Sequence, residues 1–192
     1  MTGLLRSAQA AVLGAAFSAW VAGSLAEAQD VIQEPPGYRH EHYRAPVPAT
    51  LQGAQVLDST EAEALWRAGS AAFIDVLPRL PKPANLPAGT IWREAPRPHI
   101  PGSLWLPDTG YGELAAVTED YLRRGLQRAS GGDLSRQLVF YCQANCWMSW
   151  NAAKRALGYG YVNVAWYPEG TDGWHRAELP MEDARPEPRA GE

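Results

Sequence analysis

The chain has 192 residues, the usual length of a single domain. Its 46% apolar and 20% charged residues are typical of a globular protein and exclude an intrinsically disordered chain. The formal net charge is −4 at pH 7, and Lys and Arg form no cluster along the sequence, which excludes nucleic acid as an expected partner.

Residues 1–28 differ in composition from the rest of the chain. After Arg6 comes an apolar, small-residue run, and Ala26-Glu27-Ala28 has the pattern that a signal peptidase recognises. This pattern predicts a signal peptide, with an uncut membrane anchor over the weakly hydrophobic residues 8–26 as the alternative. We expect export to the periplasm, where a disulfide persists, and no membrane span in the mature chain.

Residues 29–54 contain several prolines and predict an extended N-terminal arm or a linker. A helix is expected over residues 57–69, with Thr60 and Glu63 as its capping box and Gly69 as its stop. The apolar run at 71–77 predicts a buried strand that ends in a carboxylate.

The prolines of residues 78–98 exclude regular structure over most of that segment. A turn with a short strand is expected at 99–108. The pattern of residues 118–129 predicts an amphipathic helix, and the run at 137–142 predicts a second buried strand.

The last predicted elements are a helix over 150–157, a strand over 162–167 and a turn or short helix at 170–174. A polar, loose tail follows at 179–192. Strands that alternate with helices over residues 55–178 predict an α/β domain with a mostly parallel central sheet flanked by helices.

The position of Cys142 indicates the candidate site. Cys142 ends the strand at 137–142, and ligands of open α/β sheets bind at the carboxyl ends of the strands. The loop of residues 143–148 and the next helix are expected to direct backbone N–H groups inward, which favours a thiolate. This interpretation requires that Cys142 be reachable from solvent and face those amides.

Four stretches resemble rhodanese-like domains, in the same order along the chain: AFIDVLP, HIPGSLWLPD, LVFYC and GYGYVNVAWYPEGTDGW. The similarity covers residues 55–176 and implies a rhodanese-like fold. More narrowly, YCQANCWMSWNAAKRA resembles the exported rhodanese-like proteins associated with PQQ-dependent alcohol catabolism, a group named for a CXXCW motif. The spacing in this chain is Cys-x-x-x-Cys-Trp.

The resemblance implies roles for individual residues. Cys142 matches the sulfur-accepting nucleophile, and Asp75 matches a supporting, loop-orienting acid. Residues 99–102 match an architectural turn, and residues 169–174 match a closing segment. The loop expected to bind the substrate sulfur consists of Gln143, Ala144, Asn145, Trp147 and Met148.

Two departures from the family pattern restrict the chemistry. Rhodaneses that use thiosulfate usually carry basic residues in or after the loop, whereas residues 143–148 contain none, and Lys154 and Arg155 follow two turns later. A dianionic donor would then meet only backbone dipoles. Met148 stands where phosphatases of related architecture need Arg, which excludes phosphate-ester hydrolysis.

The long Pro-rich segment is expected to be a lid or a docking surface.

The second cysteine, Cys146, leaves alternatives open. A structural disulfide with Cys142 is one, and a metal site is a poorer one because two thiolates need further ligands. Trp147 stands where covalent haem attachment would need His. In the favoured interpretation Cys142 attacks and Cys146 resolves, so that the pair alternates between dithiol and disulfide. We expect no metal and no cofactor, PQQ included.

Aromatic and histidine residues near the site also have two interpretations. Trp147 and Trp150 either pack in the core or, for Trp147, form a wall of the thiol pocket. His40 and His42 are either exposed or a metal-binding pair.

The sequence thus predicts an exported protein with sulfurtransferase or thiol–disulfide chemistry, acting on a small sulfur donor or a protein thiol. The alternative is a non-catalytic module that assists a periplasmic quinoprotein dehydrogenase or its cytochrome.

Overall fold

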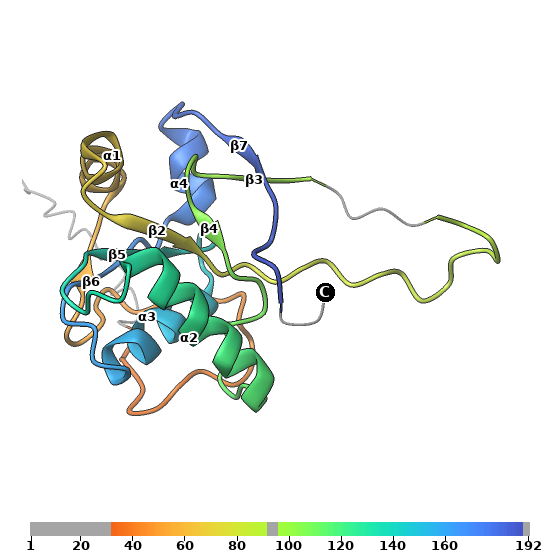
Figure 1. The fold of residues 1–192 in the computed structure, drawn as a ribbon, viewed down its shortest axis with the longest axis horizontal. Coiled ribbons are helices and arrows are strands. Elements are labelled where there is room, and N and C mark those ends of the chain that lie inside the picture. Colours follow the sequence, from red (N-terminus) through yellow and green to blue (C-terminus); the bar gives the residue numbers. More distant parts are fainter. Residues whose placement is uncertain (1–31, 92–95, 190–192) are drawn as a thin grey trace, which may run out of the picture. The chain divides into compact units, whose positions relative to one another are not determined.

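A computed structural model describes residues 32–91 and 96–189 (Figure 1). The predicted signal peptide, residues 1–28, lies outside these described residues. A five-stranded parallel sheet in the order β1-β6-β5-β2-β4 forms the centre of the domain. The strands are β1 (Gln55–Val56), β2 (Ala72–Asp75), β4 (Leu104–Trp105), β5 (Leu138–Tyr141) and β6 (Val164–Trp166). The predicted mostly parallel α/β fold is confirmed.

Strand β5 lies at the centre of the sheet, as its uninterrupted apolar run predicts. All four of its residues are buried, and it pairs with β2 on one side and β6 on the other. Phe73 of β2 lies opposite Val139, and Ile74 lies opposite Phe140. Since side chains alternate along a strand, these two pairs belong to opposite faces of the sheet.

Four helices cover the two faces of the sheet. They are α1 (Ser59–Ala68), α2 (Ala116–Ser130), α3 (Trp147–Gly158) and α4 (Gly170–Arg176). Side chains of α2 and α3 pack with Phe140 in one apolar cluster, and side chains of α1 and α4 pack with Val139 in the other. Figure 1 shows the same two layers, with α1 and α4 above the sheet and α2 and α3 below it.

Helix α1 has a capping box, but not the predicted one. The Asp58 side chain accepts a hydrogen bond from Glu61 N (2.8 Å), and the Glu61 side chain accepts one from Asp58 N (3.0 Å). The prediction of Thr60 and Glu63 was therefore wrong, because the acid at position 58 caps the helix two residues before Thr60. Gly69 ends the helix in the left-handed conformation, as predicted.

Helix α3 begins at Trp147, three residues before its predicted start at residue 150. The first N–H groups of a helix lack a partner within the helix and need one elsewhere. The N–H of Trp147 donates to the carbonyl of Tyr43 in the arm (2.9 Å). A segment distant in sequence thus provides the hydrogen-bond acceptor for the start of α3. Local sequence signals therefore do not reveal where this helix begins.

The arm of residues 32–54 packs along α3. The Asn151 side chain accepts from Arg39 N and donates to Arg39 O, both at 2.9 Å. The indole N–H of Trp150 donates to the carbonyl of Thr50 (3.2 Å), and Leu51 is buried in the core. Of the two interpretations of the arm, the structure shows the one in which it packs on the domain.

The C-terminal tail is held against the domain, which corrects the expectation that it is loose. Strand β7 (Glu182–Ala184) pairs antiparallel with β3 (Arg97–His99), which lies at the end of the Pro-rich segment. Further along, Glu187 N donates to Trp105 O (2.9 Å) and Tyr121 OH donates to Glu187 O (2.8 Å). The polar composition predicted disorder, but main-chain pairing compensates for the lack of apolar side chains.

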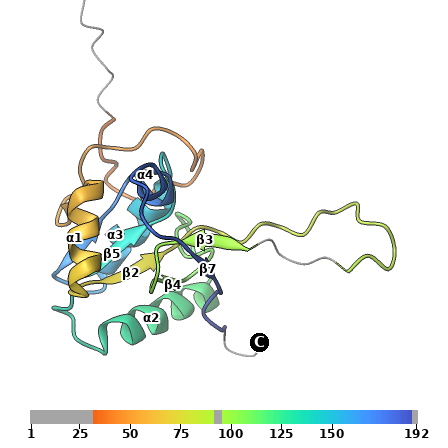
Figure 2. The same cartoon turned by 90° about the horizontal axis from the view of Figure 1, so that it is seen from above.

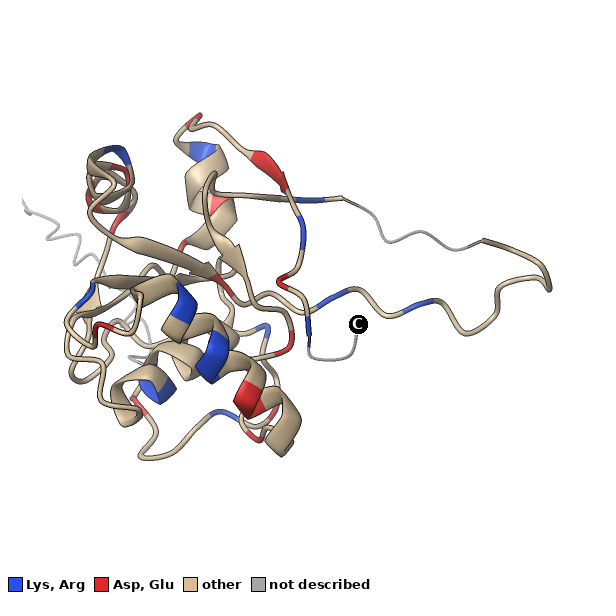
Figure 3. Cartoon of the chain, in the orientation of Figure 1, with Lys and Arg blue, Asp and Glu red and all other residues tan. Residues whose placement is uncertain are grey.

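After β2, the described residues up to 91 extend away from the sheet in both views (Figure 2). Basic and acidic positions are interspersed over the helices and loops (Figure 3). None of the helices within residues 32–91 and 96–189 has the length and hydrophobicity that a bilayer span requires.

Candidate functional site

The two cysteines of the chain lie at the two ends of one short loop. Cys142 follows β5 directly, and Cys146 is the N-cap of α3. Their Cα atoms are 6.5 Å apart, and their sulfur atoms are at disulfide-bonding distance. The loop between the carboxyl end of the central strand and the next helix therefore carries a cysteine pair that can be joined.

The arm holds one side of this loop. Ala45 N donates to Asn145 O (3.1 Å), and Trp147 N donates to Tyr43 O (2.9 Å), so that arm and loop pair in antiparallel fashion around Cys146. The indole N–H of Trp147 also donates to Pro46 O (3.0 Å). Trp147 is buried and does not line the cavity described below, which supports its core interpretation within the described structure.

The start of α4 holds the other side of the loop. The N–H and the hydroxyl of Thr171 both donate to the carbonyl of Cys142, each at 3.1 Å. Ala144 N donates to the carboxylate of Asp172 (3.1 Å). Gly170 makes this approach possible, because it adopts φ +50° and a Cβ atom there would lie 2.7 Å from the Cys142 carbonyl.

Cys142 does not have the surroundings that the sequence interpretation required. Its side chain is fully buried in the same apolar cluster as Phe140 and Trp166. The amides of Ala144 and Trp147 are used by partners other than a sulfur ligand. The expectation of a solvent-accessible Cys142 was therefore wrong, and the arm and α4 bind two of the amides that were expected to face its sulfur.

Ser149 lies beside the buried sulfur and was not identified from the sequence. Its hydroxyl oxygen is 3.2 Å from Cys142 Sγ, accepts from Trp166 Nε1 at 3.0 Å and donates to Cys146 O at 3.2 Å. Its spacing could have identified it, since a residue three positions after Cys146 lies on the same face of the helix.

Asp75 reaches the loop through Arg97. The Arg97 guanidinium binds both Asp75 oxygens, with Nε–Oδ2 at 2.6 Å and Nη2–Oδ1 at 2.9 Å, and also donates from Nη2 to Cys142 O (3.4 Å). Burial raises the pKa of the Asp75 carboxyl from its ordinary value, and the Arg97 charge opposes that shift. Asp75 is thus placed to orient Arg97, which the sequence did not indicate because it lies among prolines.

His99 extends this buried cluster. Its Nε2 lies 3.3 Å from Glu182 Oε1 of β7, and its Nδ1 lies 3.9 Å from Asp75 Oδ2. Burial lowers the pKa of His99 from its ordinary value of 6.5, although Asp75 and Glu182 act in the opposite sense. The imidazole is therefore neutral in the folded chain at neutral pH.

The lowered pKa of His99 predicts how the stability of the fold depends on pH. A histidine whose pKa is lowered by folding binds its proton more readily in the unfolded chain, so protonation favours unfolding. We expect the free energy of unfolding, measured by urea titration, to fall as the pH drops through 6.5. His99→Gln should flatten this slope, and His175→Gln, at an exposed position of α4, is the control that should not. An unchanged slope in His99→Gln would contradict the assignment.

A cavity of about 270 Å³ opens beside the second cysteine. The loop contributes Gln143, Cys146 and Met148 to its wall. Two arginines absent from the loop also line it: Arg44 of the arm and Arg79 of the Pro-rich segment. These cations were missed because their placement depends on tertiary contacts.

The cations noted in the sequence after the loop have structural contacts instead. Lys154 Nζ donates to Pro35 O (3.1 Å), and Arg155 is buried and donates to Gly112 O (2.9 Å). His40 and His42 are both exposed. Within the described part of the chain, no three side chains of His, Cys, Asp or Glu gather in a way that could hold a metal ion.

Comparison with known proteins gives a family match and several similar solved structures. The family model of the rhodanese-like domain matches residues 54–177. A thiosulfate sulfurtransferase from Pseudomonas aeruginosa is 20% identical with a TM-score of 0.48, over 69% of this chain and 21% of that one. The chain thus spans about a fifth of that protein. No curated protein gives a significant match.

Two further solved structures are similar to this chain at low identity. The polysulfide-sulfur transferase homodimer from Wolinella succinogenes is 20% identical, with a TM-score of 0.44, over 69% of this chain and 80% of that one. An uncharacterized protein from Saccharomyces cerevisiae is 19% identical, with a TM-score of 0.39, over 65% of this chain and 92% of that one.

Proposed function

Because the chain belongs to the rhodanese-like domain family, we propose that it carries out thiol–disulfide or sulfur-transfer chemistry with Cys142 and Cys146. The observation that supports this most directly is the cysteine pair at bonding distance in the loop between β5 and α3. Both cysteines are buried, and a cavity lined by Cys146 lies beside the pair.

The pair supports two balanced reactions. In thiol exchange, the disulfide is reduced to two thiols while two donor thiols are joined into one disulfide. In sulfur transfer, a sulfane sulfur bound to one cysteine as a persulfide is displaced by the other cysteine. That displacement releases hydrosulfide and leaves the protein disulfide.

We further propose a periplasmic location and an association with PQQ-dependent alcohol catabolism. The support is the leader-like pattern of residues 1–28 and the resemblance of the Cys-x-x-x-Cys-Trp stretch to the exported group. In an oxidising compartment the disulfide form of the pair persists without reductant. The physiological reaction partner is then a thiol that reduces the disulfide, on a small molecule or a protein, or a small sulfur donor that reacts with the dithiol.

A second candidate is a binding module that assists a quinoprotein dehydrogenase or its cytochrome. The burial of both cysteines favours it, as does the use of the Ala144 and Trp147 amides by other parts of the chain. A sulfurtransferase needs such donors for the charge that develops on the transferred group. In this case the disulfide stabilises the loop, and the surface of the domain binds the partner protein.

A redox titration of the folded protein tests the first proposal. The chain is equilibrated with thiol–disulfide buffers of stepped ratio, alkylated and weighed by mass spectrometry. We expect Cys142 and Cys146 to become reactive together in one two-electron transition, while the near-ultraviolet circular dichroism stays native. A pair that is reduced only when the protein unfolds would identify a structural disulfide.

Two control measurements separate the candidates. Sulfur transfer from thiosulfate to cyanide by the wild type, lost in Cys142→Ser, would support the transferase reaction. Co-purification with a dehydrogenase that persists in Cys142→Ser, without turnover of any sulfur donor, would support the binding module instead.

A further inference from the structure

We propose that Cys146, rather than Cys142, is the sulfur that an incoming thiolate attacks, and that the cavity beside it selects small anionic thiols. This inference rests on the proposed function of the pair and reverses the order of the two cysteines that the sequence favoured. It is carried by access, by charge and by the surroundings of the leaving sulfur.

Access differs between the two sulfurs. Both cysteines are buried in the same apolar cluster, with Cys142 0% and Cys146 2% exposed, so the difference lies in the cavity. The described wall of the 270 Å³ cavity includes Cys146 but not Cys142. Attack on a disulfide needs the nucleophile to approach one sulfur from outside. Of the two cysteines, Cys146 is the one that lines this cavity, so a small molecule bound there meets Cys146 before Cys142.

The charge of the cavity selects its occupant. Arg44 and Arg79 line it, and its described wall contains no Asp or Glu. The remainder of the wall is mostly apolar or aromatic, including Tyr43 and Tyr111, whose rings meet edge to face at 5.3 Å. Guanidinium groups bind carboxylates and sulfonates by paired hydrogen bonds. The fitting ligand is therefore a thiol with a second, negatively charged group.

The two arginines come from parts of the chain outside the loop. Arg44 lies in the arm, at the position where the arm pairs with Cys146. Arg79 lies in the segment that follows β2, whose basic positions are visible in Figure 3. They supply the positive charge that the residues 143–148 lack, so a loop without basic residues can still receive an anion.

The bond changes follow from this arrangement. The thiolate R–S⁻ attacks Cys146 Sγ and forms R–S–S–Cys146, the Cys142–Cys146 bond breaks, and its electron pair leaves on Cys142 Sγ. The Ser149 hydroxyl lies 3.2 Å from Cys142 Sγ, and by turning from Cys146 O it can donate its proton to that thiolate. Trp166 Nε1 fixes the hydroxyl by donating to its oxygen (3.0 Å).

A second thiolate completes the cycle. It attacks the R sulfur of the mixed disulfide, which releases R–S–S–R and leaves the thiolate of Cys146. That charge lies at the N-cap of α3, where the helix dipole favours an anion. The protein disulfide has then accepted two electrons from two thiols, and the protonated dithiol remains.

Three small thiols of similar size test the charge selectivity on the full chain. They are 2-mercaptoethanesulfonate, 2-mercaptoethanol and cysteamine, which carry a negative, a neutral and a positive group. We compare second-order rates of disulfide reduction per thiolate at one ionic strength. We expect the anion to react about tenfold faster than the cation, as electrostatic attraction into a charged cleft gives.

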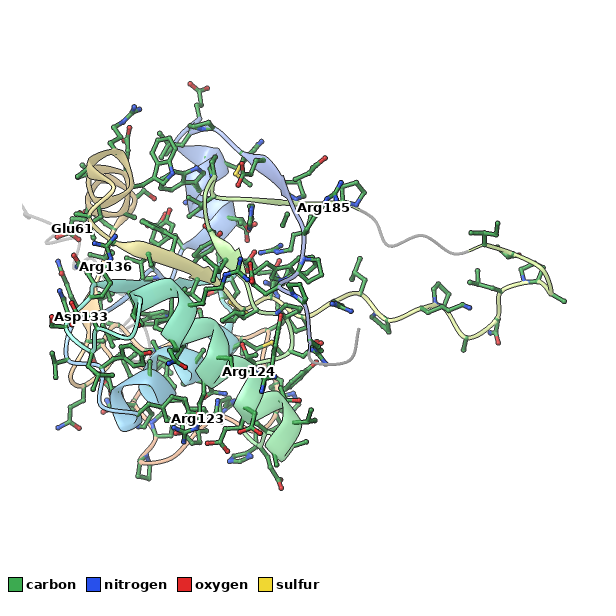
Figure 4. The ribbon with its side chains drawn as sticks, in the orientation of Figure 1. Glu61, Arg123, Arg124, Asp133, Arg136 and Arg185 are labelled. Atoms are coloured by element: carbon green, nitrogen blue, oxygen red, sulfur yellow. A yellow bond between two sulfur atoms is a disulfide. The ribbon has the colours of Figure 1, made fainter. Side chains whose placement is uncertain are left out.

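Matched variants locate the selectivity. Arg44→Gln and Arg79→Gln should each reduce the advantage of the anion, and the double variant should remove it. Arg124→Gln, on α2 and outside the cavity wall, should leave it unchanged (Figure 4). Equal rates for the three thiols in the wild type would overturn the anionic class.

Two measurements identify the attacked sulfur. After brief exposure to the sulfonate thiol and an acid quench, fragmentation mass spectrometry should place the adduct on Cys146. In single-cysteine variants, Cys142→Ser should react with the anionic disulfide DTNB at least about tenfold faster than Cys146→Ser. An adduct on Cys142 would overturn this inference and leave the proposed function standing. No exchange with any thiol in the folded chain would overturn both.

Discussion

Asp75→Asn is expected to reduce the free energy of unfolding by about 3–5 kcal/mol, the range seen when one partner of a buried ion pair is removed. Asp75 is 0% exposed and holds the Arg97 guanidinium through both oxygens, at 2.6 and 2.9 Å. An amide keeps the shape of the carboxyl but leaves a mostly buried cation without its counter-charge. Urea denaturation monitored by circular dichroism measures the loss.

Two controls separate charge loss from general damage. Asp133→Asn, on the exposed turn after α2, should change stability little (Figure 4). The double variant Asp75→Asn, Arg97→Met should recover part of the loss, because it leaves neither charge unpaired. A loss in the double variant equal to the sum of both single losses would show that the two residues act independently.

Gly170→Ala is expected to reduce the free energy of unfolding by about 2–5 kcal/mol, since it adds an overpacked methyl group to left-handed backbone strain. Gly170 has φ +50°, and its added Cβ would lie 2.7 Å from the Cys142 carbonyl and from Gln143 N. These neighbours are backbone atoms and cannot rotate away. The loop must shift, so the reduction midpoint of the cysteine pair should change as well.

Gly131→Ala is the matched control for backbone strain. Gly131 ends α2 with φ +63°, and nothing lies within 4 Å of an added Cβ. Its loss should be about 1–2 kcal/mol, the cost of the left-handed conformation alone. The difference between the two variants measures the contact with the loop. Equal losses, together with an unchanged reduction midpoint in Gly170→Ala, would refute the close approach.

The sequence predicted the elements that have strong local signals. The run from Leu138 to Tyr141 indicated a buried strand, and its end placed Cys142 at the edge where the sheet binds ligands. Gly69 ended its helix as expected, and Gly131 ends α2 in the same left-handed conformation, which glycine adopts easily. Local pattern was sufficient wherever neighbours in sequence determine the structure.

The remaining features depend on residues that are distant in sequence. Strand β1 has two residues and forms by pairing with β6, and β7 forms by pairing with β3. Neither has enough residues to show a period of its own. The same holds for Arg44, Arg79 and Arg97, which lie in or beside Pro-rich segments and reach the site only through the fold.

The pairing of the arm with α3 has a consequence for how the molecule is made. Arg39 and Asn151 hold each other across 112 positions of the chain. A ribosome releases the arm long before α3 exists, and such long-range contacts form late in folding. The arm therefore packs against the cysteine loop late in folding. Until then both sulfurs are open to any oxidant that the nascent chain meets.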